Sequence, residues 1–174
     1  MSYHPYAYPA APQPTYYQPP PPPVDPFRAY YSDRLRELTF NSRPLIQDLS
    51  MQAMYQRDQQ NWDAMRTIVE EIDRAVARAS PAHKLPLLYL IDSISKNLGA
   101  PYTTHLLPPV IPRIYKQTYR IVDGVTKSKM EEMIGLWRTG GVGGRELYPQ
   151  GVREEIEIDI YGSMRYPPPP LPTL

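Results

Sequence analysis

Four polar side chains interrupt an otherwise apolar stretch in the middle of the chain. Residues 85–98 have the sequence LPLLYLIDSISKNL, which contains Asp92, Ser93, Lys96 and Asn97. The leucines and isoleucines recur at steps of three and four, which predicts a helix that is buried over most of its circumference. Buried polar groups need hydrogen-bond partners. Either the protein supplies these partners itself, or the four side chains line a groove that a ligand completes.

Asp92 is the candidate in this cluster for acid–base chemistry, but the sequence offers it no visible base. The chain has no cysteine, no serine in a nucleophile-elbow motif, and no acidic pair with a nearby histidine. His4, His83 and His105 have no metal-ligand spacing. A simpler interpretation is that Asp92 forms an ion pair with Lys96, four residues on, on a partly solvated face. We therefore predict a protein that is not an enzyme and uses no cofactor and no metal.

A glycine cluster near the C-terminus invites comparison with phosphate-binding loops. It consists of Gly140, Gly141, Gly143 and Gly144. No Lys-Ser or Lys-Thr pair follows these glycines and no strand is predicted before them, so the phosphate-loop pattern is not met. We predict a flexible or tightly turned loop.

Composition excludes several classes of protein. The 174 residues include 19 basic and 18 acidic side chains, and the net charge of +1 predicts no general attraction to nucleic acid or membranes. The lack of cysteine rules out a secreted disulfide scaffold. The sequence contains no apolar run of transmembrane length and no signal-peptide pattern, so we expect a soluble intracellular protein.

Prolines divide the chain into three parts. Of the 23 prolines, ten lie in residues 1–26 and five in residues 163–174. We predict that 1–26 is a disordered tail rich in proline and tyrosine, that 27–162 is one globular domain, and that 163–174 is a second proline-rich tail. The first tail could be a ligand for a proline-binding domain, although its composition favours a solubilising role.

The globular part reads as a series of helices with no convincing strand. Asp25 before Pro26, Ser42 before Pro44, and Thr126 are the predicted N-caps. Apolar periodicity predicts inward-facing side chains at Met54, Trp62, Met65, Val69, Ile72, Val76, Ala79, Val110, Ile114 and Ile121. The predicted helices span about 25–38, 59–79, 85–97, 109–122, 126–139 and 152–161, another begins at Ser42 and extends through Met54, and a short helical turn lies at 104–107. Short helices joined by Pro and Gly turns indicate an all-α, layered superhelix.

Three motifs in order resemble a known family. They are ELTFNSRPLI at 37–46, LIDSISKNLGAPYT at 90–103 and YKQTYRIVD at 115–123, followed by Trp137. Together they resemble the CTD-interacting domain (CID), most closely that of the Pcf-type subunit of cleavage factor IA. The resemblance covers nearly all of 27–162. It implies a right-handed superhelix of about eight helices, related to the VHS and ENTH domains.

The resemblance also implies a ligand and a site. Members of the family bind phosphorylated Tyr-Ser-Pro-Thr-Ser-Pro-Ser repeats of the RNA polymerase II largest subunit, in a groove between their second, fourth and seventh helices. By the family motif, Asp92 accepts a hydrogen bond from the heptad tyrosine and Asn97 bonds the peptide backbone. The full set of implied peptide-binding residues is Asn41, Ser42, Arg43, Tyr89, Asp92, Ser93, Ile94 and Asn97.

One position departs from the family pattern. Some members carry, five residues before the tryptophan, an arginine that contacts the heptad phosphate, whereas this chain has Glu132. A carboxylate repels a phosphate dianion, so any preference for phosphate depends on stabilisation of the peptide turn or on nearby cations. The candidate phosphate-proximal cations are Arg43, Lys116, Lys127 and Lys129.

The function implied by the resemblance is nuclear: coupling of pre-mRNA 3′-end processing and termination to transcription. Family members of this type continue into regions that bind other processing subunits, so we expect this chain to be a fragment or a truncated product. Two alternatives remain. One is a VHS/ENTH-like membrane-traffic adaptor, although Arg28, Arg34 and Arg36 are interspersed with acids. The other is binding of nascent RNA through Arg113, Lys116 and Arg120.

Overall fold

The computed structural model describes residues 10–162, and within that range the chain is helical without any strand. The seven α-helices are α1 (Pro26–Arg36), α2 (Arg43–Asp58), α3 (Trp62–Arg78), α4 (Lys84–Leu98), α5 (Ile111–Ile121), α6 (Gly124–Leu136) and α7 (Val152–Tyr161). Short 3₁₀ turns lie at Pro81–His83 and Val142–Gly144, and a π-helical segment spans Tyr102–Leu106. Counting this segment gives eight helices, which confirms the predicted all-α superhelix.

The predicted tails are described only in part, because residues 1–9 and 163–174 lie outside the described residues. Residues 10–25 form no helix or strand, and all their side chains are exposed. Helix α1 then begins at Pro26, with the Asp25 carboxylate accepting a hydrogen bond from the Phe27 amide at 3.0 Å. The domain boundaries themselves stay predictions.

Side-chain caps begin most of the helices, as the sequence predicts for two of them. The Ser42 hydroxyl accepts from the Leu45 amide at 3.4 Å. The prediction that Thr126 is an N-cap is wrong: Asp123 caps α6 and accepts from the Thr126 amide at 2.8 Å. Asp is at least as good a cap as Thr, and its position three residues earlier starts the helix sooner.

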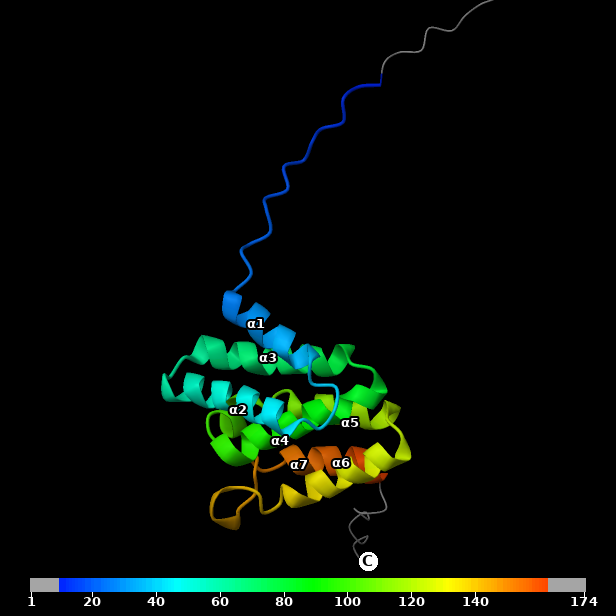
Figure 1. The fold of residues 1–174 in the computed structure, drawn as a ribbon. Helices are drawn as coiled ribbons and strands as arrows, with labels where there is room; N and C mark the ends of the chain where they lie inside the picture. Colours follow the sequence, from blue (N-terminus) through cyan, green and yellow to red (C-terminus); the bar gives the residue numbers. More distant parts are fainter. Residues whose placement is uncertain (1–9, 163–174) are drawn as a thin grey trace, which may run out of the picture.

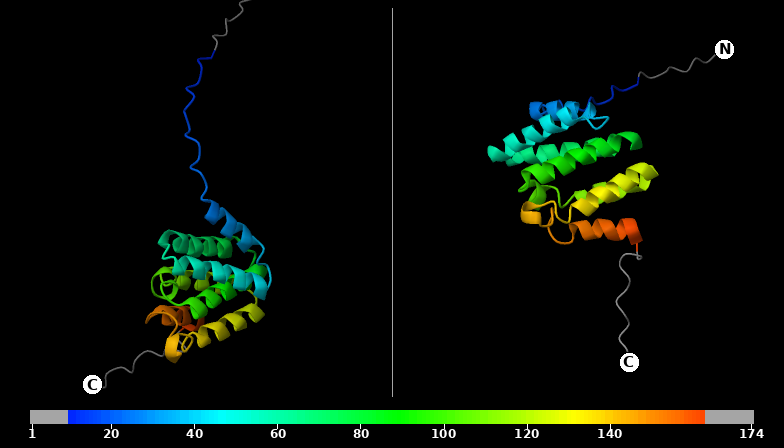
Figure 2. Two further views of the ribbon diagram at one scale, coloured as in Figure 1. Left: turned by 60° about the vertical axis from the view of Figure 1, so that its left-hand side comes forward. Right: turned by 60° about the horizontal axis from the view of Figure 1, so that its bottom comes forward.

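The helices form two layers, one of odd-numbered and one of even-numbered helices (Figures 1 and 2). Helix α1 packs on α3 and α5 on α7 in the first layer, whereas α2 packs on α4 and α4 on α6 in the second. Consecutive helices run antiparallel, so the helices within one layer run parallel. The pairs Ser50–Ser93 and Arg57–Leu98 between α2 and α4 show this parallel register.

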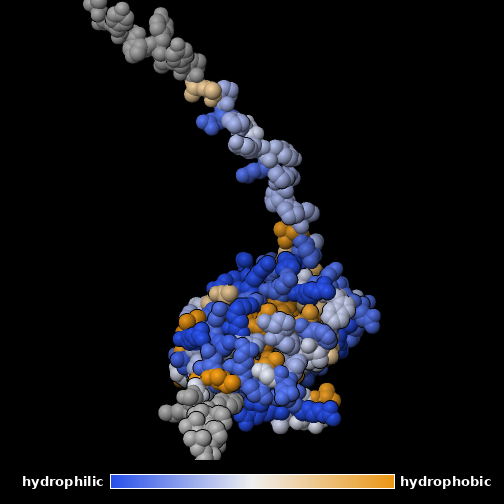
Figure 3. Space-filling model, turned by 180° about the vertical axis from the view of Figure 1, so that it is seen from behind, coloured by the Kyte–Doolittle hydropathy of each residue, from blue (hydrophilic) through white to orange (hydrophobic). Residues whose placement is uncertain are grey.

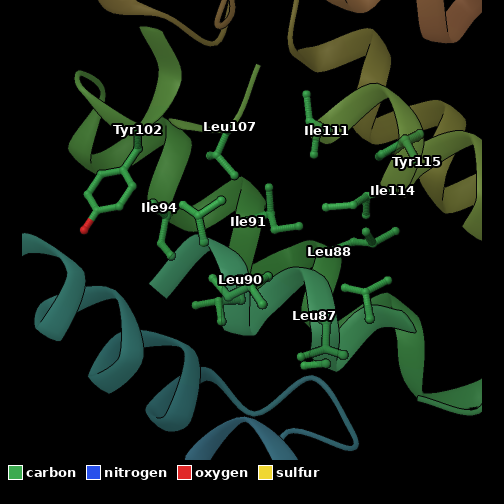
Figure 4. Close-up of a cluster of buried hydrophobic side chains, with 14 of the residues drawn as sticks. Leu87, Leu88, Leu90, Ile91, Ile94, Tyr102, Leu107, Ile111, Ile114 and Tyr115 are labelled. Carbon is green, nitrogen blue, oxygen red and sulfur yellow. The ribbon is translucent and has the colours of Figure 1, made fainter. Parts of the chain in front are cut away.

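Helix α4 is the centre of the hydrophobic core (Figure 4). Leu87, Leu88, Leu90, Ile91 and Ile94 are each at most 2% exposed. They face α2, α3 and α5, so α4 is apolar on all sides except the one that carries its polar residues. The prediction of a helix buried over most of its circumference is confirmed.

Three residues predicted to point inward are exposed instead. Trp62 is 42% exposed, Met54 39% and Ile121 55%. Trp62 and Ile121 are the terminal residues of α3 and α5, where the apolar stripe extends beyond the neighbouring helix. At the C-terminal half of α2, Ala53 occupies the buried position, which leaves Met54 outside. Periodicity identifies the face of a helix but not how far its neighbours cover it.

Buried tyrosines connect the helices through their hydroxyl groups. Tyr31 donates to the Leu49 carbonyl at 3.2 Å, Tyr102 to the Ala53 carbonyl at 2.8 Å, and Tyr115 to the Met130 carbonyl. The hydroxyl of Tyr148 pairs with that of Ser95 at 2.6 Å. Burial raises the pKa of all four phenols above the ordinary value near 10.

These pKa shifts predict alkaline destabilisation. Above about pH 10 the unfolded chain ionises its tyrosines while the folded domain keeps the four protons, so the stabilisation is complete below that pH and is lost as the pH rises. Each of the four phenols lowers the free energy of unfolding by up to about 1.4 kcal/mol per pH unit in this window. Urea titrations between about pH 8 and about pH 11 measure this slope, and a stability independent of pH there would contradict the prediction.

Candidate binding groove

The Asp92 carboxylate is held by two donors and remains reachable from solvent. Its Oδ1 atom accepts a hydrogen bond from the Trp137 indole Nε1 at 2.9 Å, and its Oδ2 atom lies 3.1 Å from the Lys96 ammonium. The Asp92 side chain is 19% exposed. A carboxylate offers about four lone-pair sites, so each oxygen can accept a further hydrogen bond. The predicted Asp92–Lys96 ion pair is confirmed, but it leaves the carboxylate able to accept further hydrogen bonds.

Trp137 fixes the position of this carboxylate, because its own indole is fully buried and held in place by packing. It packs between the rings of Tyr115 and Tyr148, with both pairs of centroids 5.0 Å apart in edge-to-face geometry. A buried indole N–H needs an acceptor, and here Asp92 provides it. Sequence reasoning missed this hydrogen bond, although an apolar-faced tryptophan and an otherwise unexplained buried acid are the features that could have suggested it.

The glycine-rich loop at residues 140–144 reverses the chain, so that the residues after it lie beside Trp137. The Leu147 amide donates to the Trp137 carbonyl at 2.8 Å, which brings Tyr148 back beside the indole. Gly141 lies inside this turn, and a β-carbon there would be 2.6 Å from the Glu146 carbonyl oxygen. The tight turn is therefore the correct one of the two predicted forms of this loop.

A second set of polar groups joins α4 to α2. The hydroxyls of Ser93 and Ser50 are 3.0 Å apart, and the Asn97 amide donates to the Ser93 hydroxyl at 3.2 Å. Beside these groups lies an open groove between the two helices. Its lining residues are Gln47, Ser50, Met51, Met54, Ser93, Asn97 and Leu98. The groove therefore has a polar edge on α4 and a methionine-rich wall on α2.

The structure places most of the predicted peptide-binding residues in one layer. Tyr89, Asp92 and Ser93 are half-buried and Asn97 is exposed, and all four lie on the outward side of α4. Asn41, Ser42 and Arg43 lie at the start of α2, the neighbouring helix of the same layer, where Ser42 acts as the N-cap. These residues stay predictions as peptide contacts.

Ile94 differs from the prediction. Its side chain is 1% exposed and lies among the core residues, near Leu90 and Tyr102 (Figure 4). It follows Ser93 directly, and successive helical residues are about 100° apart, so one faces the groove and the other the core. Ile94 therefore supports the groove from behind and has no surface with which to contact a peptide.

The predicted phosphate-proximal cations are not all together. Lys129 is exposed near the start of α6, and Lys127 lies 5.1 Å above the ring of Tyr119. Lys116 lies in the other layer, where its ammonium is 2.8 Å from the Glu155 carboxylate. The placement of Lys116 near the groove is wrong, because α5 belongs to the odd-numbered helices and its cations pair with α3 and α7.

The basic residues proposed to bind RNA also lie in the odd-numbered layer, where they form ion pairs. Arg120 lies 2.9 Å from Asp159, and Arg113 forms two hydrogen bonds with Asp73. With Lys116, each of the three cations therefore faces an acid on a neighbouring helix. Seen from behind, the molecule is largely hydrophilic with scattered apolar side chains (Figure 3).

Comparison with known proteins gives the family. Residues 29–148 match the CID domain. This chain belongs to the CID domain family. The matched range includes α2, α4 and α6, the glycine-rich loop and Tyr148, so every residue of the groove described above lies within the CID domain.

The chain is similar to three curated proteins over part of their length. It is 35% identical over 127 residues to protein PCF11 of Saccharomyces cerevisiae, covering 73% of this chain and 19% of that protein. It is 37% identical over 112 residues to an uncharacterised protein of Schizosaccharomyces pombe, covering 62% and 16%. For human regulation of nuclear pre-mRNA domain-containing protein 1A, the identity is 27% over 135 residues, covering 76% and 39%.

A solved structure shares the fold. The crystal structure of the RPR of Pcf11 superposes with a TM-score of 0.68 at 34% sequence identity, covering 75% of this chain and 95% of that one. The present chain thus corresponds to nearly all of that CID structure but to less than a fifth of the yeast protein's length.

Residues 10–162 show neither a candidate metal site nor a candidate membrane-spanning helix. No group of three or more His, Cys, Asp or Glu side chains is arranged to hold a metal ion in this range. None of the helices described there is both long enough and apolar enough to cross a membrane.

The tryptophan–aspartate contact predicts a loss of stability in Trp137→Phe. Phenylalanine keeps an aromatic ring between Tyr115 and Tyr148 but removes the donor to Asp92, so the free energy of unfolding should fall by about 3 kcal/mol. Urea denaturation of the full chain measures the change. Trp62→Phe is the matched control, since Trp62 is 42% exposed, and it should stay within about 0.5 kcal/mol of the parent. Equal losses in both variants would show that the hydrogen bond has no special role.

Proposed function

We propose that the α2–α4 groove, together with the neighbouring Asp92 carboxylate that Trp137 holds at the end of α6, binds heptad repeats of the RNA polymerase II C-terminal domain. The observation that carries the proposal is the Asp92 carboxylate, which is fixed by Trp137 and Lys96 yet 19% exposed. The family membership and the similarity to PCF11 support it further. The CID family to which the chain belongs is a family of protein-interaction domains.

Recognition would depend on the heptad tyrosine. A phenol donates one hydrogen bond, and Asp92 is an acceptor with capacity to spare. Hydrogen bonds to charged groups contribute about 1.5–3 kcal/mol, so a peptide without the hydroxyl is discriminated against. Asn97, exposed one helical turn after Ser93, is then the donor and acceptor for the peptide backbone. Tyr89 forms part of the wall for the tyrosine ring.

Phosphate would be sensed at the N-terminal end of the groove. Helices α2, α4 and α6 run parallel, so Arg43 and Lys129 lie near the same end of the layer. Glu132 is exposed on α6 and opposes a phosphate at that position. We therefore assign phosphate sensing to Arg43 and Lys129, with Lys127 held over Tyr119 as a secondary cation.

The proposed biological role is to tether a pre-mRNA 3′-end processing factor to transcribing polymerase in the nucleus. The names of the relatives, which include a regulator of nuclear pre-mRNA, agree with this role. The two alternatives lose their support, because the cations proposed for RNA are paired with acids and, on α1, Arg28 and Arg34 are paired as well.

Asp92→Ala should weaken heptad binding. The wild-type chain should bind a heptad peptide with a dissociation constant on the order of micromolar, and removal of the acceptor should weaken this by about tenfold or more. Fluorescence titration of a labelled two-repeat peptide with the full chain measures the change. A peptide with phenylalanine in place of each tyrosine should bind both proteins equally weakly, since a pairwise contact disappears when either partner is removed.

Asp63→Ala is the matched control for this substitution. Asp63 also lies on a helix beside a basic residue, but its side chain is 95% exposed and lies on α3, outside the groove. Its alanine variant should bind the heptad like the parent. Equal affinities of the Asp92 variant and the parent for the tyrosine peptide would refute the proposed contact.

Glu132→Arg should create a preference for phosphate. The substitution replaces a repelling charge with a bidentate donor, so the affinity for a heptad phosphorylated at its second-position serine should rise by about tenfold while that for the unmodified peptide changes little. Asp63→Arg changes the net charge of the chain by the same amount away from the groove and should leave both affinities unchanged. If both variants gain affinity equally, the effect is general electrostatics and position 132 does not face the phosphate.

A further inference from the structure

The N-terminal segment carries the same chemistry as the proposed ligand. Tyr17-Gln18-Pro19 has the tyrosine-to-proline spacing of the heptad's Tyr-Ser-Pro, and Tyr16 provides a second phenol beside it. Both tyrosine side chains are 85% exposed. Residues 10–25 extend away from the helices in the structure (Figure 1), so these phenols are available to bind elsewhere.

An exposed apolar path leads from the root of this segment to the groove. Tyr30, one turn into α1, is 49% exposed, and its hydroxyl accepts a hydrogen bond from Gln52 of α2 at 3.2 Å. Around α2 from Gln52 lie the exposed Tyr55 (60%) and Met51 (61%), and beyond them Met54 (39%); the two methionines form the α2 wall of the groove. Methionine side chains adapt to irregular apolar partners such as tyrosine and proline rings.

The segment is long enough to follow this path. Pro26 follows Tyr17 by nine residue steps, and five consecutive prolines at 19–23 favour the polyproline II conformation. At about 3.1 Å per residue, nine residues reach about 28 Å. Side-chain hydrogen bonds join α1 to α2, and α2 packs on α4, so two interhelical spacings of 8–10 Å amount to about 20 Å. A tyrosine at position 16 or 17 can therefore reach Asp92 of its own chain.

Tethering compensates for a weak contact. A segment attached through a short linker acts at an effective concentration on the order of millimolar. The preformed polyproline conformation also reduces the entropy lost on docking. A tail that binds the groove with only millimolar affinity as a free peptide would therefore occupy it for a substantial fraction of the time.

We propose that residues 16–19 fold back across α2 and occupy the groove of their own domain, with a tyrosine hydroxyl donated to Asp92, so that the tail competes with the heptad ligand. The inference rests on the proposed function, since it assigns a competitor to the same groove. The extended tail of the structure is then the open state, which accepts polymerase repeats. Methionines 51 and 54 form the surface on which the tail lies in the closed state.

The test uses the full chain with the hydroxyl groups of both tyrosines removed by the double substitution Tyr16→Phe and Tyr17→Phe. Loss of the competing hydroxyls should tighten heptad binding by about twofold, the factor that follows from a millimolar effective concentration acting on a millimolar contact. The matched control is Gln13→Ala with Thr15→Ala, which alters the tail next to residues 16–19 without changing the proposed contact and should leave the affinity unchanged. In an Asp92→Ala background, the tyrosine substitutions should have no effect.

A second measurement detects the tail without any heptad. Trp137 donates its indole N–H to Asp92, so its NMR resonance should shift between the wild-type chain and the double phenylalanine variant. Trp62→Phe, applied to both proteins, leaves Trp137 as the single indole. The shift should be independent of protein concentration, as expected for a contact within one chain, and a concentration-dependent shift would overturn the assignment to the chain's own groove.

The outcomes separate the two proposals. Failure of the wild-type chain to bind the heptad refutes the proposed function, and the indole resonance alone then decides whether the tail reaches Asp92. Normal heptad binding that is unchanged by the tyrosine substitutions, together with an unshifted indole resonance, overturns the tail proposal and leaves the proposed function intact.

Discussion

The hydrogen bond from the Trp137 indole to Asp92 is the contact on which the site depends. It crosses from α6 to α4, and it satisfies at once the one polar atom of a fully buried tryptophan and one oxygen of a half-buried acid. Either group alone would be costly to bury. Together with Tyr115 and Tyr148, which pack against the indole from two sides, the contact fixes the carboxylate at the surface of an otherwise apolar helix.

The two layers of the fold divide the charged side chains between them. In the odd-numbered layer, ion pairs run from α1 to α3, from α3 to α5 and from α5 to α7. The even-numbered layer is joined by hydroxyls, an amide, an indole and the Arg57 guanidinium on the Leu98 carbonyl, with Lys96 as the cation beside Asp92. As a result, one side of the molecule has its cations neutralised, and the other presents hydrogen-bonding groups that are only partly satisfied.

Features encoded within one helix could be predicted from the sequence, and features that depend on two helices could not. The step of three and four in residues 85–98 predicts α4 and its burial, and the Pro and Gly positions predict most of the helix ends. The resemblance in three short motifs predicts the family. In contrast, Lys116 meets Glu155 and Asp92 meets Trp137 across about 40 residues of chain, and no local pattern shows such pairs.

The rotation of a helix about its own axis is the second feature that could not be predicted from the sequence. Ser93 and Ile94 are adjacent in one motif, yet the packing of α4 against α2 and the π-helical segment turns one outward and the other inward. The same reason explains Met54, whose neighbour Ala53 takes the buried position. Motif resemblance therefore identifies the segment that forms a site, and the packed structure decides which side chains in it are available.

The crowded turn at Gly141 bears on how natural variants of this domain should be interpreted. The residue lies in a loop and is not among those that line the groove, so a survey of contact surfaces alone would class an alanine there as harmless. Yet the added methyl group would collide with the Glu146 backbone. The collision would displace the loop segment that brings Tyr148 back beside the indole. A defect in ligand recognition could thus be inherited through a residue that never meets the ligand.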